Sequence, residues 1–129
     1  MLTTCNGCFD GPIIHPGHTF FLGYAAAQAD ELVVGINSDD YIVRHKRTKP
    51  FCNQEERQKR LIKLEFIKDV IIFDEENPIE FIKKVIPDVH CTGEEYLNRC
   101  AEKEFCLVHG IKLVFVPRVG TWATANFNQ

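Results

Sequence analysis

The chain has 129 residues, of which 45% are hydrophobic and 26% charged, and its formal net charge is −3. This size and mixture fit one soluble globular domain, residues 1–129, with a core of its own. The near-neutral charge disfavours a nucleic-acid-binding protein, and no apolar run approaches the roughly 18 residues that a membrane helix needs. Because no signal peptide is visible at residues 1–4, the sequence predicts a cytoplasmic protein.

Strand-like and helix-like segments alternate along the chain. A strand is predicted over residues 2–8, and a helix over residues 17–28, where Phe21, Tyr24, Ala25 and Gln28 follow helical spacing. A buried strand is predicted at 32–36, and the polar, basic segment 38–50 after it is interpreted as a loop. The later predictions are, in order, a helix from Asn53 to Phe66, a strand at 69–73, a helix opened by Asn77-Pro78, a strand at 87–91, a helix at 95–109 closed by Gly110, and a strand at 112–116.

Five strands that alternate with helices predict an α/β fold, a Rossmann-like open parallel five-stranded sheet with helices on both faces. Ligands of such sheets bind beyond the carboxyl ends of the strands, at the point where the strand order reverses. Four polar segments are expected to gather there, namely residues 8–18, 38–49, 92–96 and 118–126.

Two histidines stand at the predicted junction between the first strand and the first helix, in the run His15-Pro16-Gly17-His18. At a spacing of three they share one face of a helix, and Gly17 lets the backbone approach a ligand closely. The helix N-terminus adds N–H groups and a partial positive charge at the same place. The run therefore predicts a phosphate site. The alternatives are a capping or surface role, or metal ligation, for which no third ligand is obvious nearby.

Six cysteines raise the question of a disulfide framework. Cys8, Cys91 and Cys106 lie in apolar segments, where free cysteine behaves as a small hydrophobic residue. Cys5 and Cys8 form a C-x-x-C on the first strand, whereas a redox motif is expected at the start of a helix. We predict unpaired thiols and no metal site. A thiol redox protein that uses Cys5 and Cys8 is kept as an alternative.

The run Asn6-Gly7-Cys8-Phe9-Asp10, followed by His15-Pro16-Gly17-His18, resembles the H-x-G-H cytidylyltransferase-like nucleotidyltransferases. The resemblance covers nearly the whole chain and includes residues 34–39, Lys46, Glu56-Arg57 and residues 91–96. Within the family, the sequence looks closest to the adenylyltransferase domain of heptose 1-phosphate activation. Glycerol-3-phosphate cytidylyltransferase is similar.

The resemblance implies that an acceptor phosphate attacks the α-phosphorus of a nucleoside triphosphate, ATP or CTP, and that pyrophosphate leaves. Mg²⁺ would accompany the triphosphate, and the chain would form a homodimer, with Trp122 and Phe127 as candidate contacts. The residues whose roles the resemblance implies are His15, His18 and Lys46 in catalysis, Arg57 on a substrate phosphate, and Gly7, Cys8, Phe9, Asp10, Gly17, Gly93, Glu94 and Thr124 in nucleotide binding.

Several of these residues also have a purely structural interpretation. Lys46 fits a solvated loop charge, Arg57 an ion pair on its own helix, Asp10 a loop cap, and Glu94 a surface carboxylate. Two departures from the family bear on the site. Four residues separate Asp10 from His15 where the family usually has two, and Thr124 alone keeps a hydroxyl in the turn with which the family contacts the triphosphate.

The leading hypothesis is a sugar 1-phosphate adenylyltransferase, an enzyme that makes a nucleotide-activated sugar or polyol from ATP or CTP. One alternative is a cytidylyltransferase of the glycerol-3-phosphate type. Another is a relic that binds nucleotide with weak or no turnover, because the turn around Thr124 is altered. No side chain decides between adenine and cytosine.

Overall fold

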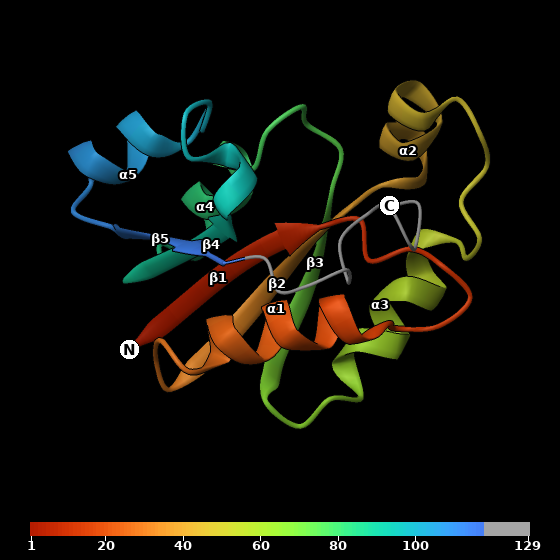
Figure 1. Ribbon diagram of the computed structural model, residues 1–129, viewed down its shortest axis with the longest axis horizontal. Helices are drawn as coiled ribbons and strands as arrows, with labels where there is room; N and C mark the ends of the chain where they lie inside the picture. Colours follow the sequence, from red (N-terminus) through yellow and green to blue (C-terminus); the bar gives the residue numbers. More distant parts are fainter. Residues whose placement is uncertain (118–129) are drawn as a thin grey trace.

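The computed structural model of the chain describes residues 1–117. One parallel sheet in the order β3-β2-β1-β4-β5 forms the centre of the molecule (Figure 1). The strands are β1 (Leu2–Gly7), β2 (Glu31–Asn37), β3 (Ile67–Phe73), β4 (Val89–Gly93) and β5 (Lys112–Val116). The predicted open parallel sheet is thereby confirmed. Because β2 and β4 flank β1 on opposite sides, the strand order reverses at β1, and a ligand site is expected at its carboxyl end.

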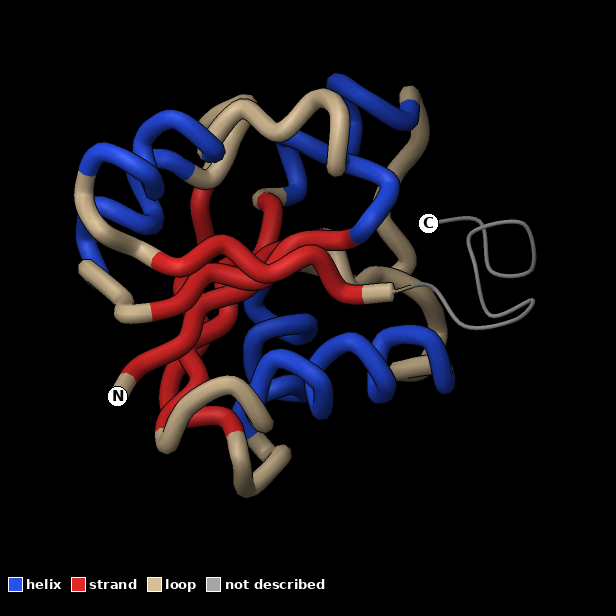
Figure 2. The backbone as a smooth tube through the Cα atoms, turned by 60° about the vertical axis from the view of Figure 1, so that its left-hand side comes forward, coloured by secondary structure: helices blue, strands red, loops and turns tan. Residues whose placement is uncertain are grey.

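Helices cover both faces of the sheet, as predicted (Figure 2). On one face, Leu22 of α1 (Pro16–Ala26) and Leu61 of α3 (Gln54–Ile62) join the core cluster of β1, β2 and β4. On the other face, Phe81 of α4 (Ile79–Val85) and Cys106 of α5 (Lys103–Val108) form a second cluster. No helix within residues 1–117 is long and apolar enough to cross a membrane.

The segment predicted as a basic loop is largely a helix, α2 (Asp39–Lys46). The side chain of Ser38 caps it by accepting the Tyr41 N–H at 3.0 Å. Acidic residues stand in its first turn and basic residues in its last, which complements the helix dipole at both ends. Arg47, with a φ of 55°, ends the helix in the left-handed region. The loop interpretation was wrong because the same run of charged residues fits either a solvated loop or a short helix with acidic residues at its start and basic residues at its end.

Two helix boundaries also differ from those predicted. Helix α3 ends at Ile62 instead of Phe66, because Leu64 turns the chain tightly into β3 by bonding Leu61 and Ile67 through its backbone. The predicted helix 95–109 is a short 3₁₀ turn, η1 (Glu94–Tyr96), followed by turns and then α5. The α5 segment begins after Glu102, whose buried carboxylate bonds the buried His90 of β4. The chain then leaves α5 through Gly110, at a φ of 68°, as predicted.

Substitution of Gly35 by alanine is expected to destabilise the fold by about 1–3 kcal/mol, because a Cβ there would lie 2.8–2.9 Å from atoms of the Phe81 ring in a packed core. Gly23 in α1 is the matched control, since its Cβ would meet nothing within 4 Å. Alanine at Gly23 is expected to stabilise the protein by up to about 1 kcal/mol through helix propensity. Urea unfolding of both variants measures the difference. Equal effects would contradict the close contact between β2 and α4.

Candidate functional site

A cavity of about 560 Å³ opens at the carboxyl ends of β1, β2 and β4. Its position agrees with the reversal of strand order at β1. Several residues predicted for the site line this cavity together, although they lie far apart in the sequence: Gly7, Cys8, Phe9, Gly17, His18, Lys46 and Gly93. Thr124, Trp122 and Phe127 lie outside the described residues.

His15 and His18 stack against each other at the start of α1, with ring centroids 3.7 Å apart and planes inclined by 27°. His15 is the N-cap residue, and Pro16 occupies the first turn. The edge of the Phe9 ring contacts His18, at a centroid distance of 5.2 Å. Both imidazoles are largely buried, at 3% and 5% exposure, so their rings are held in one orientation. The pair therefore adds two fixed nitrogen-bearing rings to the positive end of a helix dipole.

The protonation state of His15 follows from its contacts. The Gly17 N–H donates to His15 Nδ1 at 3.1 Å, so that nitrogen carries no proton. Burial also lowers the pKa of His15 from its ordinary value of 6.5. At neutral pH the ring is therefore uncharged, with its proton on Nε2, where it can donate to a phosphate oxygen.

We expect an NMR titration of the free protein to place the pKa of His15 below 6.5, and its ¹⁵N pattern to report the Nε2–H tautomer. Since folding lowers this pKa, the unfolded chain binds the proton more readily. The contribution of His15 to stability is therefore full above pH 6.5 and is lost as the pH falls through the folded pKa. A pKa at or above 6.5, or an Nδ1–H tautomer, would show that the cap geometry is wrong.

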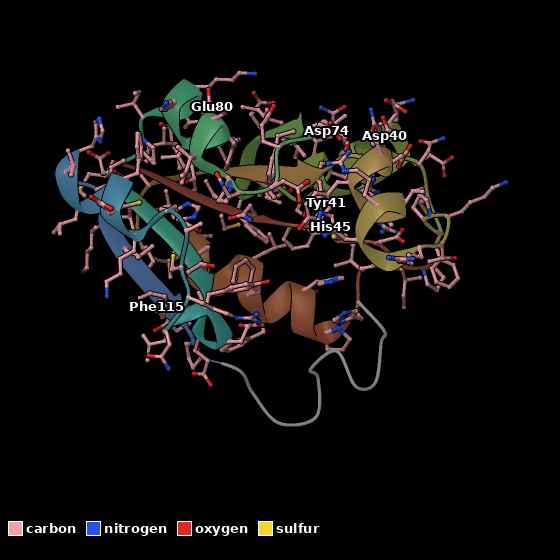
Figure 3. All side chains as sticks on the ribbon, turned by 90° about the horizontal axis from the view of Figure 1, so that it is seen from above. Asp40, Tyr41, His45, Asp74, Glu80 and Phe115 are labelled. Atoms are coloured by element: carbon pink, nitrogen blue, oxygen red, sulfur yellow. The ribbon has the colours of Figure 1, made fainter. Side chains whose placement is uncertain are left out.

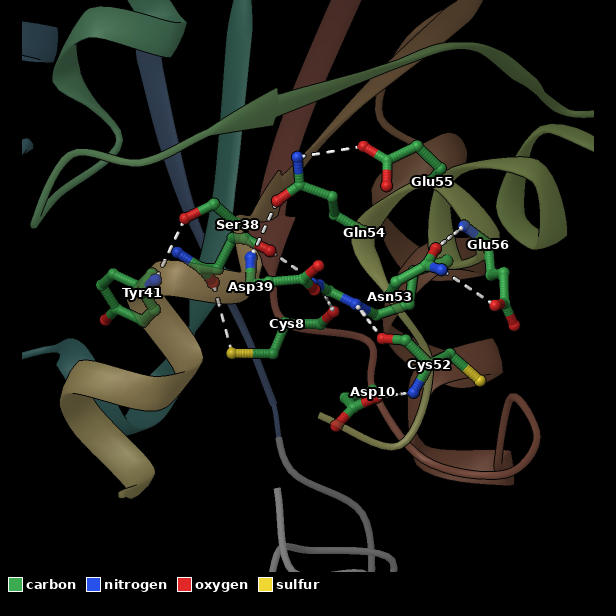
Figure 4. A network of polar contacts seen from close by, with 12 residues as sticks. Cys8, Asp10, Ser38, Asp39, Tyr41, Cys52, Asn53, Gln54, Glu55 and Glu56 are labelled. Atoms are coloured by element: carbon green, nitrogen blue, oxygen red, sulfur yellow. Dashed lines mark hydrogen bonds and ion pairs between the residues drawn. The ribbon is translucent and has the colours of Figure 1, made fainter. Parts of the chain in front are cut away.

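Arg57 does not lie in the cavity wall, and the expectation that it holds a substrate phosphate is corrected. Its side chain has no exposed surface. It donates to the carbonyl groups of Cys8 at 2.9 Å and Asn37 at 2.6 Å, and to Cys52 O at 3.1 Å. It also pairs with the Asp39 carboxylate at 2.8 Å. Cys8, Asp39 and Cys52, which accept these bonds, are labelled in Figure 4. Arg57 thus ties the ends of β1 and β2 to the segment that leads into α3.

Asp10 also differs from its predicted role. Its carboxylate accepts the backbone N–H groups of Phe51 and Cys52 at 2.9 and 3.1 Å, and it is not among the residues that line the cavity. Arg60 of α3 donates to Phe9 O and Gly11 O at 2.9 and 3.0 Å. The four-residue segment between Asp10 and His15 is therefore anchored at its base, and the carboxylate holds a loop.

On the β2 side of the cavity, α2 presents Lys46 together with Tyr41 and His45. Glu76, from the turn after β3, lines the same wall. Glu76 was missed because its position depends on contacts with a distant segment. Tyr41 and His45 were missed because α2 was interpreted as a loop. The i, i+4 spacing of Tyr41 and His45 after a Ser-Asp-Asp cap was the signal that could have found them.

On the β4 side, the cavity is lined by Gly93 and by Glu95 rather than the predicted Glu94. Tyr96 and Arg99 follow, with the guanidinium carbon 5.3 Å from the centre of the phenol ring. Such paired planar groups suit an aromatic ligand. Tyr96 belongs to the segment 92–96 that was expected at this end of the sheet, but neither it nor Arg99 was predicted as a site residue, because residues 95–109 were interpreted as one continuous helix.

All six cysteines are free in the described structure, as predicted. Cys5 is fully buried, and burial raises its pKa well above the ordinary range. Burial also raises the pKa of Cys8, although Lys46 and Arg57 oppose this effect. Because redox chemistry at a C-x-x-C needs an accessible thiolate, the structure disfavours the thiol redox alternative.

A profile of the cytidylyltransferase-like family matches residues 4–125 of the chain. The chain is 35% identical over 123 residues to the bifunctional protein HldE of Azorhizobium caulinodans, a match that covers 94% of the chain and 25% of that relative. It is 38% identical over 109 residues to HldE of Helicobacter pylori strain P12, covering 80% of the chain and 23% of the relative. The chain thus spans about a quarter of the length of these curated relatives.

Solved structures share the fold. A lipopolysaccharide core biosynthesis protein of Thermoplasma volcanium superposes with a TM-score of 0.71 at 24% identity, over 92% of this chain and 96% of that one. The pantothenate synthetase of Thermus thermophilus gives a TM-score of 0.63 at 14% identity, over 92% of this chain and 56% of that one.

Proposed function

Because the chain belongs to the cytidylyltransferase-like family, we propose that it is a nucleotidyltransferase acting on a phosphorylated sugar or polyol. The nucleoside triphosphate is ATP or CTP, and a sugar 1-phosphate adenylyltransferase is the favoured form. The observation that carries the proposal is the stacked pair of His15 and His18 at the N-terminus of α1, beside a cavity large enough for a nucleotide.

In the proposed reaction, an oxygen of the acceptor phosphate attacks the α-phosphorus of the triphosphate. A new P–O bond forms, the bond between the α-phosphorus and the bridging oxygen breaks, and pyrophosphate leaves with the electron pair. A phosphomonoester loses its second proton near pH 6, so the acceptor is already largely anionic at neutral pH and needs no general base. Catalysis then consists of alignment and charge stabilisation.

The chain supplies these two effects from fixed positions. His18 lines the cavity and donates there. Neutral His15, which stacks on His18 and is not among the residues that line the cavity, would donate through Nε2 beside it. Lys46 contributes a positive charge from the last turn of α2. The positive end of the α1 dipole lies at the same place and favours an anion there. Together these donors would stabilise the charge that develops on the leaving pyrophosphate.

Mg²⁺ is the proposed cofactor, carried by the triphosphate and held mainly by its oxygens. One feature of the cavity fits this ion. The Oδ1 atom of Asn6 is buried at the cavity and has no hydrogen-bond partner among residues 1–117, so it can accept from a water of the ion's shell. When bound, the ion would neutralise charge on the triphosphate. A homodimer is also part of the proposal.

The test is pyrophosphate release in the presence of Mg²⁺, with ATP and CTP offered in parallel against sugar 1-phosphates and glycerol 3-phosphate. Release from one pair of substrates supports the proposal and identifies the base and the acceptor together. Nucleotide binding without release from any pair supports instead the relic that binds nucleotide, for which the altered turn around Thr124 is the motivating observation.

A further inference from the structure

The cavity has two walls of different chemistry. The wall on the β4 side carries Tyr96 with Arg99 stacked on it, and the apolar Val116 and Pro117 nearby, which suits the flat face of a nucleobase. The wall on the β2 side carries a carboxylate, an imidazole and an amide, which are groups that exchange hydrogen bonds with hydroxyls. In the transfer, the two substrates meet at their phosphates and extend away from each other. The nucleobase therefore lies at the β4-side wall and the body of the acceptor at the β2-side wall.

Glu76, whose side chain is 62% exposed, is the carboxylate of the β2-side wall. Its Oε1 lies 2.8 Å from His45 Nε2, and its Oε2 lies 3.0 Å from Arg44 Nη2. Arg44 also binds Asp74 at 3.1 Å, and Asp74 in turn accepts a hydrogen bond from Ser38, the cap of α2. Although Glu76 comes from the turn after β3, these contacts hold it against the helix.

Tyr41 and His45 complete this wall from α2. Their rings stack with centroids 4.2 Å apart and planes inclined by 29°. Both side chains project from α2 toward the middle of the molecule (Figure 3). Aromatic faces of this kind pack against the C–H faces of a carbohydrate, while a neighbouring carboxylate takes its hydroxyls.

The charge pattern fixes which end of an acceptor meets this wall. A carboxylate repels a phosphate group, whereas His18 and Lys46 attract one within the same cavity. Each oxygen of Glu76 has a protein donor and keeps acceptor capacity for a further one, since a carboxylate accepts about four hydrogen bonds. A phosphorylated polyol therefore fits with its phosphate at His18 and Lys46 and its hydroxyls at Glu76.

We propose that Glu76, held by His45 and Arg44, is a specificity-determining residue that accepts hydrogen bonds from the acceptor's hydroxyl groups. The chain thereby selects an aldose 1-phosphate over a phosphomonoester that lacks hydroxyls. This inference rests on the proposed nucleotidyltransferase function and assigns the acceptor's orientation within that site.

The test compares Glu76→Ala with Glu75→Ala, the same change at a neighbouring exposed carboxylate that does not line the cavity. Pyrophosphate release is measured with an aldose 1-phosphate and with propyl phosphate, which has no hydroxyl on its carbon chain. Glu76→Ala is expected to lower kcat/KM for the aldose 1-phosphate by roughly 10- to 100-fold, because a hydrogen bond to a charged group is lost. Its rate with propyl phosphate, its KM for the triphosphate and both rates of Glu75→Ala are expected to stay unchanged.

Equal losses with both acceptors, or no loss with the aldose 1-phosphate, would overturn the assignment of Glu76. Calorimetric binding of the same two acceptors, without triphosphate, separates this assignment from the proposed function. If the wild-type protein releases no pyrophosphate from any pair, the function fails. In that case, wild-type protein that binds the aldose 1-phosphate more tightly than propyl phosphate, with the difference lost in Glu76→Ala, would still support the role of Glu76. Equal affinities of the wild type and Glu76→Ala for the aldose 1-phosphate would refute it.

Discussion

Replacing His18 with alanine is expected to lower kcat for pyrophosphate release by about 100- to 1000-fold, the usual effect of removing one preorganised donor to a developing charge. The His18 ring lines the cavity and stacks on His15, so its loss removes one donor and frees the other ring to reorient. The KM for the triphosphate is expected to change less than kcat, since the helix N-terminus and Lys46 still bind phosphate in the ground state.

His109→Ala is the matched control for this variant. His109 is exposed, stacks on Phe105 of its own segment at 4.1 Å, and is not among the residues that line the cavity. Full activity in His109→Ala, together with a large loss in His18→Ala, assigns the effect to the site. A His18→Ala enzyme that keeps wild-type kcat would refute the catalytic role of the histidine pair.

Replacing Arg57 with alanine is expected to lower the free energy of unfolding by about 3–5 kcal/mol, because one partner of a buried polar network is removed. The change leaves Asp39 without its cation, and it leaves three backbone carbonyls, of which the Asn37 contact is fully buried, without this donor. Since a typical domain is stable by only about 5–15 kcal/mol, the variant is expected to be largely destabilised at 37 °C. Urea unfolding followed by far-UV circular dichroism measures the loss.

Arg44→Ala tests whether burial, and not the number of ion pairs, sets the size of that loss. Arg44 makes two ion pairs, with Asp74 and Glu76, but its side chain is 43% exposed. Exposed pairs contribute about 0–1 kcal/mol each, so this variant is expected to unfold nearly as the wild type does. Comparable losses from Arg44→Ala and Arg57→Ala would contradict the account given for the buried guanidinium.

The sheet could be predicted from the sequence because its strands are short apolar runs. Residues 32–36 and 112–116 lie within or coincide with observed strands, since a buried parallel strand has no polar face to obscure the pattern. The histidine pair could be predicted for a related reason. Proline and glycine between two histidines indicate the start of a helix and an approachable backbone, both of which are local properties.

The roles of Arg57 and Glu76 could not be predicted, because each depends on contacts between distant segments. Arg57 bonds Cys8 and Asn37, 49 and 20 residues away, and a sequence gives no sign that its charge faces inward. Glu76 is positioned by a helix more than 30 residues earlier. An arginine on a short amphipathic helix can lie at the surface or inside, bonded to several segments. The sequence of the helix does not distinguish these positions until the packing of the sheet is known.

Two arginines of α3 hold the loop after β1 through its backbone. Arg57 donates to the carbonyl group of Cys8, and Arg60 donates to those of Phe9 and Gly11. Such contacts are indifferent to which side chains the loop carries. Pro12 and Ile13, which are exposed, can therefore change in the course of evolution, or in a mutant library, without releasing the loop from its support. Gly11, at a φ of 125°, and Ile14, which packs against the core, are more constrained. Ile13, already 65% exposed, is the natural starting position for such variation. The fold thus separates the backbone contacts that support this loop from exposed positions at which its sequence can vary.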